Sequence, residues 1–128
     1  YGELRRDAVA CERHNLLRPS DPPAVPYVRR CLEGTEGPVI AASDYLRTLP
    51  DGLARWLPRR LYSLGTDGYG RSDTRGALRD FFEVDARYVA LAALKALAGE
   101  GDGVAAAEVV RARDELGISA DKRDPLRG

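Results

Sequence analysis

The hydrophobic positions of this chain form two short runs that predict β-strands. One run covers residues 38–42 (PVIAA), and the other covers residues 61–64 (LYSL). Neither run alternates regularly between apolar and polar residues, and such runs are typical of parallel strands that are covered on both faces. We therefore expect two buried parallel strands, with Ser43 and Asp44 beginning a helix directly after the first.

Apolar side chains recur at helical spacing after the first run, and they predict a helix that Pro58 ends. Pro50 lies inside this segment. We expect it to break or kink the helix near Thr48, because proline lacks the N–H that a helix interior needs. The apolar positions are Tyr45, Leu49, Leu53, Trp56 and Leu57.

Capping residues predict three more helices after the second run. Serine, threonine and aspartate are favoured before a helix, and glycine is favoured after it. The expected helices are one capped by Ser72-Asp73 that contains Leu78, Phe81 and Phe82, one from Asp85 through Ala98, and one over residues 104–116 followed by Gly117.

The segments outside these elements carry less regular patterns. Residues 3–17 mix a few apolar positions with many charges, too irregularly to predict a helix. Four prolines between residues 18 and 26 predict an extended connector, and residues 27–32 are long enough for one or two helical turns. The charged residues after Ile118 are expected to be loosely held.

This element order predicts a single domain of the α/β class. Strand–helix units favour a mostly parallel sheet between helices, a three-layer arrangement. Two strands alone would leave exposed edges, and the chain begins with Tyr1 and contains no Met. We therefore expect the first strand or strands to come from an upstream part of a longer polypeptide. The expected parts are a lead-in over residues 1–36, an α/β core over residues 37–117 and a tail over residues 118–128.

Composition and charge narrow the classes of function. Twenty basic and 20 acidic residues give a formal net charge of zero, which argues against nucleic-acid binding. The longest nearly apolar stretch, residues 88–98, is too short to cross a bilayer, and the first residues lack the apolar core of a secretory signal. We expect a cytoplasmic protein with no membrane contact, in which Cys11 and Cys31 are reduced thiols.

Two clusters of side chains could form a catalytic or ligand-binding site, and for each one a purely structural role is an alternative. Cys11 and His14 would share a helix face and could pair as thiolate and imidazole, but no third residue orients the imidazole. With one histidine and two cysteines in the chain, they do not complete a zinc site either. Residues 55–60 place Trp56 among three arginines that could hold a phosphate backbone, but a buried Trp56 beside solvated arginines is favoured.

The segment LGTDGYGRSD, residues 64–73, is the most informative part of the chain. Its glycines follow a predicted strand and precede a predicted helix, where backbone N–H groups can face an anion. Their order matches neither a dinucleotide-binding motif nor a P-loop, so a structural turn is favoured. Asp67, Ser72 and Asp73 lack the spacing of a calcium loop, and helix capping accounts for the last two.

Four stretches of the sequence carry a resemblance to a known family. They are CERHNLLRP (residues 11–19), VPYV (25–28), GPVIAASDYLRTLP (37–50) and LGTDGYGRSDTRGALRDFFEVDARYVALAAL (64–94). They resemble the C-terminal domain of the homodimeric pyruvate dehydrogenase E1 component, a transketolase-like thiamine diphosphate enzyme. The longest stretch is also similar to transketolase C-terminal domains. His14 departs from the tryptophan that better-known E1 members carry there.

The resemblance implies a large homodimeric enzyme with three α/β domains, of which this chain is most of the third. It implies that the other two domains bind thiamine diphosphate and Mg²⁺. It also implies that the enzyme decarboxylates pyruvate and passes the two-carbon unit to the lipoyl group of the E2 dihydrolipoyl acetyltransferase, the step from glycolysis to acetyl-CoA.

No catalytic, cofactor-binding or metal-binding residue of that family maps onto residues 1–128. We therefore expect this segment to be inactive alone and to have a structural, dimer-forming role. A loop near the active-site entrance is expected to contact the rest of the E1 chain and its dimer mate. The loop residues are Thr66, Asp67, Tyr69, Arg71, Ser72 and Asp73.

Two alternatives remain open. The first is an E1 or transketolase-like enzyme that acts on another 2-oxo acid or on a sugar, since the residues that select the substrate lie outside this chain. The second is a stand-alone, non-catalytic interaction module derived from the same domain.

Overall fold

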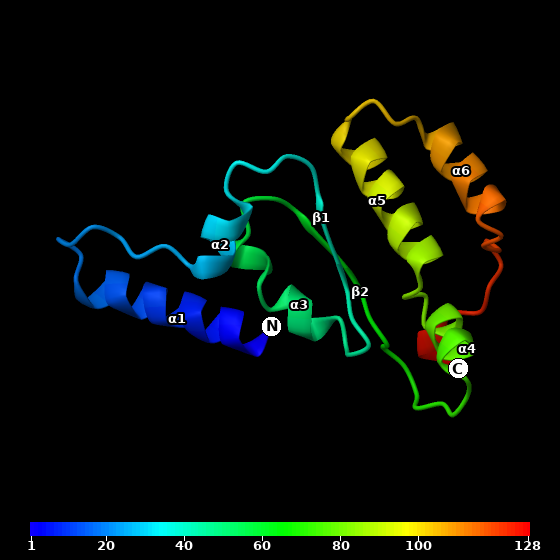
Figure 1. Ribbon diagram of the computed structural model, residues 1–128, viewed down its shortest axis with the longest axis horizontal. Helices are drawn as coiled ribbons and strands as arrows, with labels where there is room; N and C mark the ends of the chain where they lie inside the picture. The colour runs from blue at the N-terminus through cyan, green and yellow to red at the C-terminus, as the bar shows by residue number, and fades with distance from the viewer.

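Two parallel strands form the centre of the structure, a computed structural model that describes residues Tyr1–Gly128 (Figure 1). β1 (Val39–Ala42) and β2 (Leu61–Leu64) pair from Val39 opposite Leu61 to Ala42 opposite Leu64. Both predicted strands and their parallel pairing are confirmed. The prediction that they are buried is wrong for this chain: their residues are half-buried, and Ala42 is exposed. The reason is that the sheet has only these two strands, so each keeps a free edge.

Helices lie on both sides of the strand pair (Figure 1). One side carries α1 (Gly2–Leu17), α2 (Tyr27–Leu32), α3 (Thr48–Asp51) and the 3₁₀-helix η1 (Ala54–Trp56). The other side carries α4 (Arg75–Phe81), α5 (Ala86–Glu100), α6 (Ala106–Glu115) and the 3₁₀-helix η2 (Pro125–Arg127). This layering is that of an α/β fold.

Helix α1 is the first departure from the sequence-based expectation, which assigned no helix to residues 3–17. Ala8 faces inward with 0% exposure and packs with Val28, Leu53 and Trp56, while Leu4 lies against the same cluster. The contact surface of α1 is therefore narrow and centred on alanine. Such a surface produces a weak hydrophobic pattern in the sequence, although tertiary packing stabilises the helix.

Trp56 is the largest side chain of this cluster, with 7% of its surface exposed. Its indole Nε1 donates a hydrogen bond of 2.8 Å to Glu12 Oε1 of α1. The Arg55 guanidinium pairs with the same carboxylate and lies 4.9 Å from the centre of the Trp56 ring. Residues 55 and 56 are thus used within the fold, and the interpretation of Trp56 as a core residue is confirmed.

The connector and α2 agree with the prediction. No regular element covers residues 18–26, and α2 follows directly. The Asn15 side chain at the end of α1 holds the connector through two bonds to Ala24, accepting from its N–H at 2.7 Å and donating to its carbonyl at 3.0 Å. These bonds satisfy backbone groups that an extended segment cannot pair by itself.

The helix expected between residues 43 and 57 is mostly absent. Only α3 and η1 form, and Ser43 accepts a hydrogen bond from the Tyr45 N–H at 3.0 Å instead of capping a helix. Pro50 is the third residue of α3 and is buried. Proline is tolerated in the first turn because the N–H groups there have no acceptor within the helix. Pro50 therefore lies in the first turn of a short helix instead of breaking a long one.

The caps of the later helices are partly as predicted. Asp85 caps α5 as expected, accepting from the Arg87 N–H at 2.9 Å and the Tyr88 N–H at 3.3 Å. The expected cap at Ser72-Asp73 is wrong, because Thr74 Oγ1 accepts from the Ala77 N–H at 3.3 Å and Asp73 bonds only to the Thr74 N–H. Thr74, directly before the helix, fits the cap position better than Ser72 and Asp73, which lie two residues and one residue too early.

The tail, residues 118–128, is not loosely held as expected. Ile118 and Pro125 are buried, and Lys122 donates a hydrogen bond of 3.1 Å to the carbonyl of Phe81. The charged composition of the tail concealed this packing, because a few inward-facing residues hold it while the others remain in solvent.

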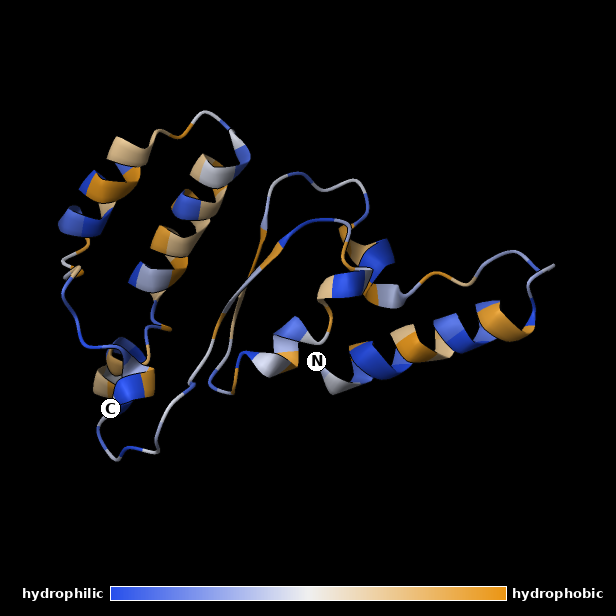
Figure 2. Ribbon diagram, turned by 180° about the vertical axis from the view of Figure 1, so that it is seen from behind, coloured by the Kyte–Doolittle hydropathy of each residue, from blue (hydrophilic) through white to orange (hydrophobic).

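The chain leaves much of its surface exposed. Twelve of 128 residues are buried, and the accessible surface is 8601 Å². A compact protein of 14.0 kDa exposes about 6,700 Å². A groove of about 330 Å³ between α1, α2 and β1 is lined almost entirely by hydrophobic side chains, and Figure 2 shows parts of both strands in the hydrophobic colour. These elements therefore do not bury one another completely.

No helix in the structure is both long and apolar enough to span a bilayer.

Candidate functional site

The glycine-spaced loop, residues 65–74, connects the end of β2 to the start of α4. It lies beside residues 43–47, which follow the end of β1. Parallel strands place their carboxyl ends at the same edge of a sheet, and loops at that edge are where α/β proteins most often build binding surfaces. The six residues predicted to form the interface all belong to this loop.

Two of the three glycines in the loop are required by close backbone contacts. A Cβ at Gly65 would lie 2.6 Å from the Tyr45 carbonyl oxygen. At Gly68, where φ is +126°, it would lie 2.6 Å from the Pro125 carbonyl oxygen. A Cβ at Gly70 would meet nothing within 4 Å. The interpretation of the glycines as a structural turn therefore holds for Gly65 and Gly68.

Thr66 and Asp67 bind the loop to the turn after β1. Thr66 donates from its N–H to the Tyr45 carbonyl and from Oγ1 to the Asp44 carbonyl, both at 2.9 Å. Asp67 Oδ2 accepts from the Arg47 N–H at 3.2 Å and lies 3.2 Å from Nε of the same arginine. These two half-buried residues thus hold the loop to the turn after β1, and Thr66 also lines the hollow described below.

The other four predicted residues lie on the outside of the loop. Tyr69 is 77% exposed, and Ser72 is exposed without a hydrogen bond from its side chain. The Arg71 guanidinium lies 4.4 Å from the centre of the Phe81 ring and 3.7 Å from the Asp73 carboxylate. The structure therefore divides the six residues into an inner pair and an outer group of Tyr69, Arg71, Ser72 and Asp73.

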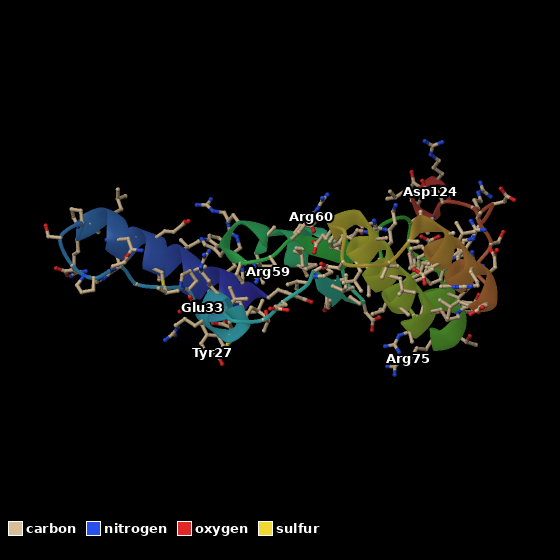
Figure 3. The ribbon with its side chains drawn as sticks, turned by 90° about the horizontal axis from the view of Figure 1, so that it is seen from above. Tyr27, Glu33, Arg59, Arg60, Arg75 and Asp124 are labelled. Atoms are coloured by element: carbon tan, nitrogen blue, oxygen red, sulfur yellow. The ribbon has the colours of Figure 1, made fainter.

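A hollow of about 530 Å³ lies between the outer loop, α4 and Asp44. Its floor is apolar and includes Leu78 and Phe82. Arg75 and Arg79 of α4 line it together with Arg71, and Arg79 lies 3.3 Å from the Asp44 carboxylate. Arg75 makes no ion pair, and Figure 3 shows its side chain pointing away from the ribbon.

Sequence analysis missed Arg75 and Arg79 as members of this site. The available signal was their spacing, because Arg75 and Arg79 are four residues apart, which places helical residues on one face. Asp44 carried no such signal, since only the tertiary structure brings the turn after β1 beside α4. The carboxylates of Asp44 and Asp73 also line the hollow and pair with Arg79 and Arg71, so Arg75 is its one arginine without an ion pair. An apolar floor beside this cation suits contact with a partly apolar surface that carries an acidic group.

The first of the two clusters, Cys11 and His14, is not joined by a hydrogen bond in the structure, and His14 Nδ1 instead lies 3.4 Å from the Arg18 guanidinium. Burial, followed by the negative charge of Asp7, raises the pKa of the Cys11 thiol, which opposes formation of the nucleophilic thiolate.

The chain offers no carboxylate cluster for the Mg²⁺ ion that accompanies thiamine diphosphate. No group of three His, Cys, Asp or Glu side chains comes together in a way that could hold a metal ion, and Mg²⁺ bound to a diphosphate needs oxygen ligands of this kind.

Comparison with known proteins identifies the class to which this fold and loop belong. A family described as the transketolase-like TK C-terminal domain matches residues 4–85. The chain belongs to this family.

The relatives are more specific. The chain is 49% identical over 127 residues to the pyruvate dehydrogenase E1 component of Pseudomonas aeruginosa, and 45% identical over 130 residues to that of Mycobacterium tuberculosis. It is 41% identical over 126 residues to the pyruvate dehydrogenase E1 component of Escherichia coli. Each match covers 98% of this chain and 14% of the relative. The chain thus spans about a seventh of the length of these relatives.

Proposed function

We propose that this chain is part of the C-terminal domain of a pyruvate dehydrogenase E1 component. The complete enzyme would decarboxylate pyruvate and reductively acetylate the lipoyl group of the E2 dihydrolipoyl acetyltransferase. The observation that carries the proposal is the 49% identity, over 98% of the chain, to a protein of that name. The proposal locates the enzyme in the cytoplasm as a homodimer.

Within this enzyme, the segment has a structural rather than a catalytic role. Thiamine diphosphate and Mg²⁺ would be bound by other domains, which agrees with the lack of a carboxylate cluster for Mg²⁺ in this chain. The outer loop residues and the arginines of the hollow would contact the rest of the E1 chain or its dimer mate near the active-site entrance. The exposure of Tyr69 and Arg75 supports this assignment, since both are free to enter an interface.

The unpaired edges of the strand pair support a further part of the proposal. One or more strands from elsewhere in the E1 polypeptide would complete the sheet and cover the hydrophobic groove beside β1. The accessible surface of 8601 Å², well above that of a compact chain of this size, is the physical basis for this expectation. The covered surface would be the interface between this segment and the remainder of its domain.

The test is release of carbon dioxide from pyruvate by the full-length protein with thiamine diphosphate and Mg²⁺. We expect turnover of pyruvate and slower turnover of longer 2-oxo acids and of sugar phosphates assayed in parallel. Absence of pyruvate decarboxylation by a folded, cofactor-loaded protein would contradict the assignment, and faster turnover of another 2-oxo acid would transfer it to that substrate. A native polypeptide of only 14 kDa in source cells would favour the stand-alone module.

The interface role has its own test. Among the three arginines of the hollow, only Arg75 makes no ion pair. Arg75→Glu reverses its charge and should weaken dimerisation or lower kcat while leaving the fold intact. Arg13→Glu on α1 is the matched control for the charge change, because Arg13 is also exposed and also makes no ion pair. Equal dimerisation constants and rates for wild type and both variants would exclude an interface at Arg75.

A further inference from the structure

The tail returns from the end of α6 to the glycine-spaced loop (Figure 1). It begins at buried Ile118, passes along α4 and ends in η2 with buried Pro125. The tail thereby lies next to two segments that precede it in sequence by more than 40 residues. Its contacts are concentrated at Lys122 and Pro125.

Lys122 binds the carboxyl end of α4. Its Nζ donates hydrogen bonds to the carbonyls of Asp80 and Phe81, the latter at 3.1 Å, and lies 3.7 Å from the Glu83 carboxylate. The same Nζ lies 5.0 Å from the centre of the Tyr88 ring, and 21% of the side chain is exposed. Carbonyls in the last turn of a helix have no partner within the helix, so an ammonium group there satisfies them and opposes the negative end of the helix dipole.

Glu83, which takes part in this contact, has a backbone φ of +62°. A residue other than glycine rarely adopts this left-handed conformation unless surrounding contacts hold it there. The ammonium group of Lys122 lies beside it and supplies such a contact. The turn from α4 to α5 is thus bound to the tail at its most unusual residue.

Pro125 contacts the other end of the same segment. Its carbonyl oxygen occupies the position that leaves room only for glycine at residue 68. Asp124 orients this carbonyl by capping η2, accepting a hydrogen bond of 2.9 Å from the Leu126 N–H. The tail therefore touches the loop near its start and α4 at its end, while the hollow lies between these two points.

From these contacts we infer that the tail is a strap that fixes the conformation of residues 65–83 and so sets the shape of the hollow. Lys122 and Pro125 are its positioning residues. The outer part of the loop has few contacts: Tyr69 is exposed, and a Cβ at Gly70 would meet nothing within 4 Å. Four polar contacts, made by Thr66 and Asp67, hold the loop to the turn after β1. The strap acts on the fold of the loop, whichever substrate the enzyme uses.

The first test measures how strongly the tail contacts protect the Lys122 amine from a reagent in the wild-type, full-length protein. Residues 1–128 contain two lysines, Lys95 on α5 and Lys122, and Lys95 is exposed without a bond from its ammonium group. Brief treatment with an amine-acylating reagent, followed by peptide mass spectrometry, compares their rates. We expect Lys122 to react at least tenfold more slowly than Lys95, and equal rates would overturn the inference.

The second test measures the effect of the strap on the loop. Hydrogen–deuterium exchange of loop peptides covering residues 65–74 is compared among the wild type, Lys122→Ala and the control Lys95→Ala, which removes the same charge at a site without contacts. We expect exchange of these peptides to rise at least fivefold in Lys122→Ala alone, with peptides of α1 unchanged. Unchanged loop exchange would overturn the inference.

A milder variant keeps the second test decisive if Lys122→Ala loses protection throughout the chain. Lys122→Gln retains one shorter donor for the α4 carbonyls, so the fold should persist with a weakened strap. Exchange of the loop that rises above the wild type in Lys122→Gln, again without a change in α1, supports the inference. Exchange equal to the wild type contradicts it.

Discussion

The two sides of the strand pair are held together by different interactions. On the side of α1–α3, the apolar cluster of Ala8, Val28, Leu53 and Trp56 joins segments that are distant in sequence. On the side of the glycine-spaced loop, many of the joining contacts are hydrogen bonds between a side chain and the backbone: Thr66 and Lys122 donate to carbonyls, and Asp67 accepts from an N–H. The stability that apolar packing contributes depends on the volume of the buried side chains, whereas the strength of a hydrogen bond depends on the positions of its donor and acceptor. Substitutions should therefore affect the two sides in different ways.

The largest effect is expected at Trp56, where the apolar side depends on one large side chain. Trp56→Ala should lower the free energy of unfolding by about 3–5 kcal/mol, because it leaves a cavity beside Ala8 and leaves Glu12 without its indole donor. Urea denaturation followed by circular dichroism measures the change. Arg59→Ala is the control, since Arg59 is exposed and only donates to the Thr35 carbonyl. A similar loss in both variants would refute the importance of the buried indole.

The next effect is expected at the glycines, where the loop side depends on close backbone approach. Gly65→Ala should cost about 1–3 kcal/mol, because its Cβ would overlap the Tyr45 carbonyl and the Arg47 N–H, which are backbone groups with little freedom to move. Gly70→Ala should change stability by less than about 0.5 kcal/mol, because nothing lies within 4 Å of its Cβ. Thermal unfolding of the two variants gives the difference, and equal melting temperatures would contradict the contact at Gly65.

A smaller effect separates the true cap of α4 from its neighbours. Thr74→Ala should destabilise the protein by about 1 kcal/mol, since it removes the acceptor for the Ala77 N–H. Ser72→Ala should have almost no effect, because the Ser72 side chain makes no hydrogen bond. Chemical denaturation of both variants measures the difference. A larger loss for Ser72→Ala would restore the cap position expected from the sequence.

The smallest effect is a dependence on pH at the apolar side. The hydrogen bond from Trp56, together with Arg55, lowers the pKa of the Glu12 carboxyl below its usual value. A carboxyl whose pKa is lower in the folded state stabilises the fold above its unfolded pKa, about 4.3 for glutamate, and this contribution is lost as the pH falls through the folded pKa.

Glu12→Gln should therefore lose less stability than the wild type between about pH 5 and pH 3. Glu100→Gln, at an exposed residue without a hydrogen bond, is the control and should follow the wild type. Urea midpoints at the two pH values measure the difference. Equal acid sensitivity in all three proteins would show that Glu12 does not contribute through its charge.

The comparison also shows which features could be predicted. Both strands, the Asp85 cap and the importance of the glycine-spaced loop are encoded by residues that are adjacent in sequence, and the structure confirms the strands and the cap. The helix expected after β1 failed because Pro50 permits only a short helix that begins one turn later. The six predicted loop residues do come from one loop, but Thr66 and Asp67 face inward, which no local pattern could reveal.

The sequence by itself determined the elements whose stability depends on neighbouring residues, namely the two apolar strands, the capped helix α5 and the proline-rich connector. It also carried enough similarity to identify the family. Only the tertiary structure decided that α1 is a helix packed through Ala8, that Gly68 faces Pro125 and that Lys122 binds the end of α4. The physical reason is that these contacts join residues far apart in sequence, from 20 positions for Ala8 and Val28 to 57 for Gly68 and Pro125, so their energy appears only once the chain has folded.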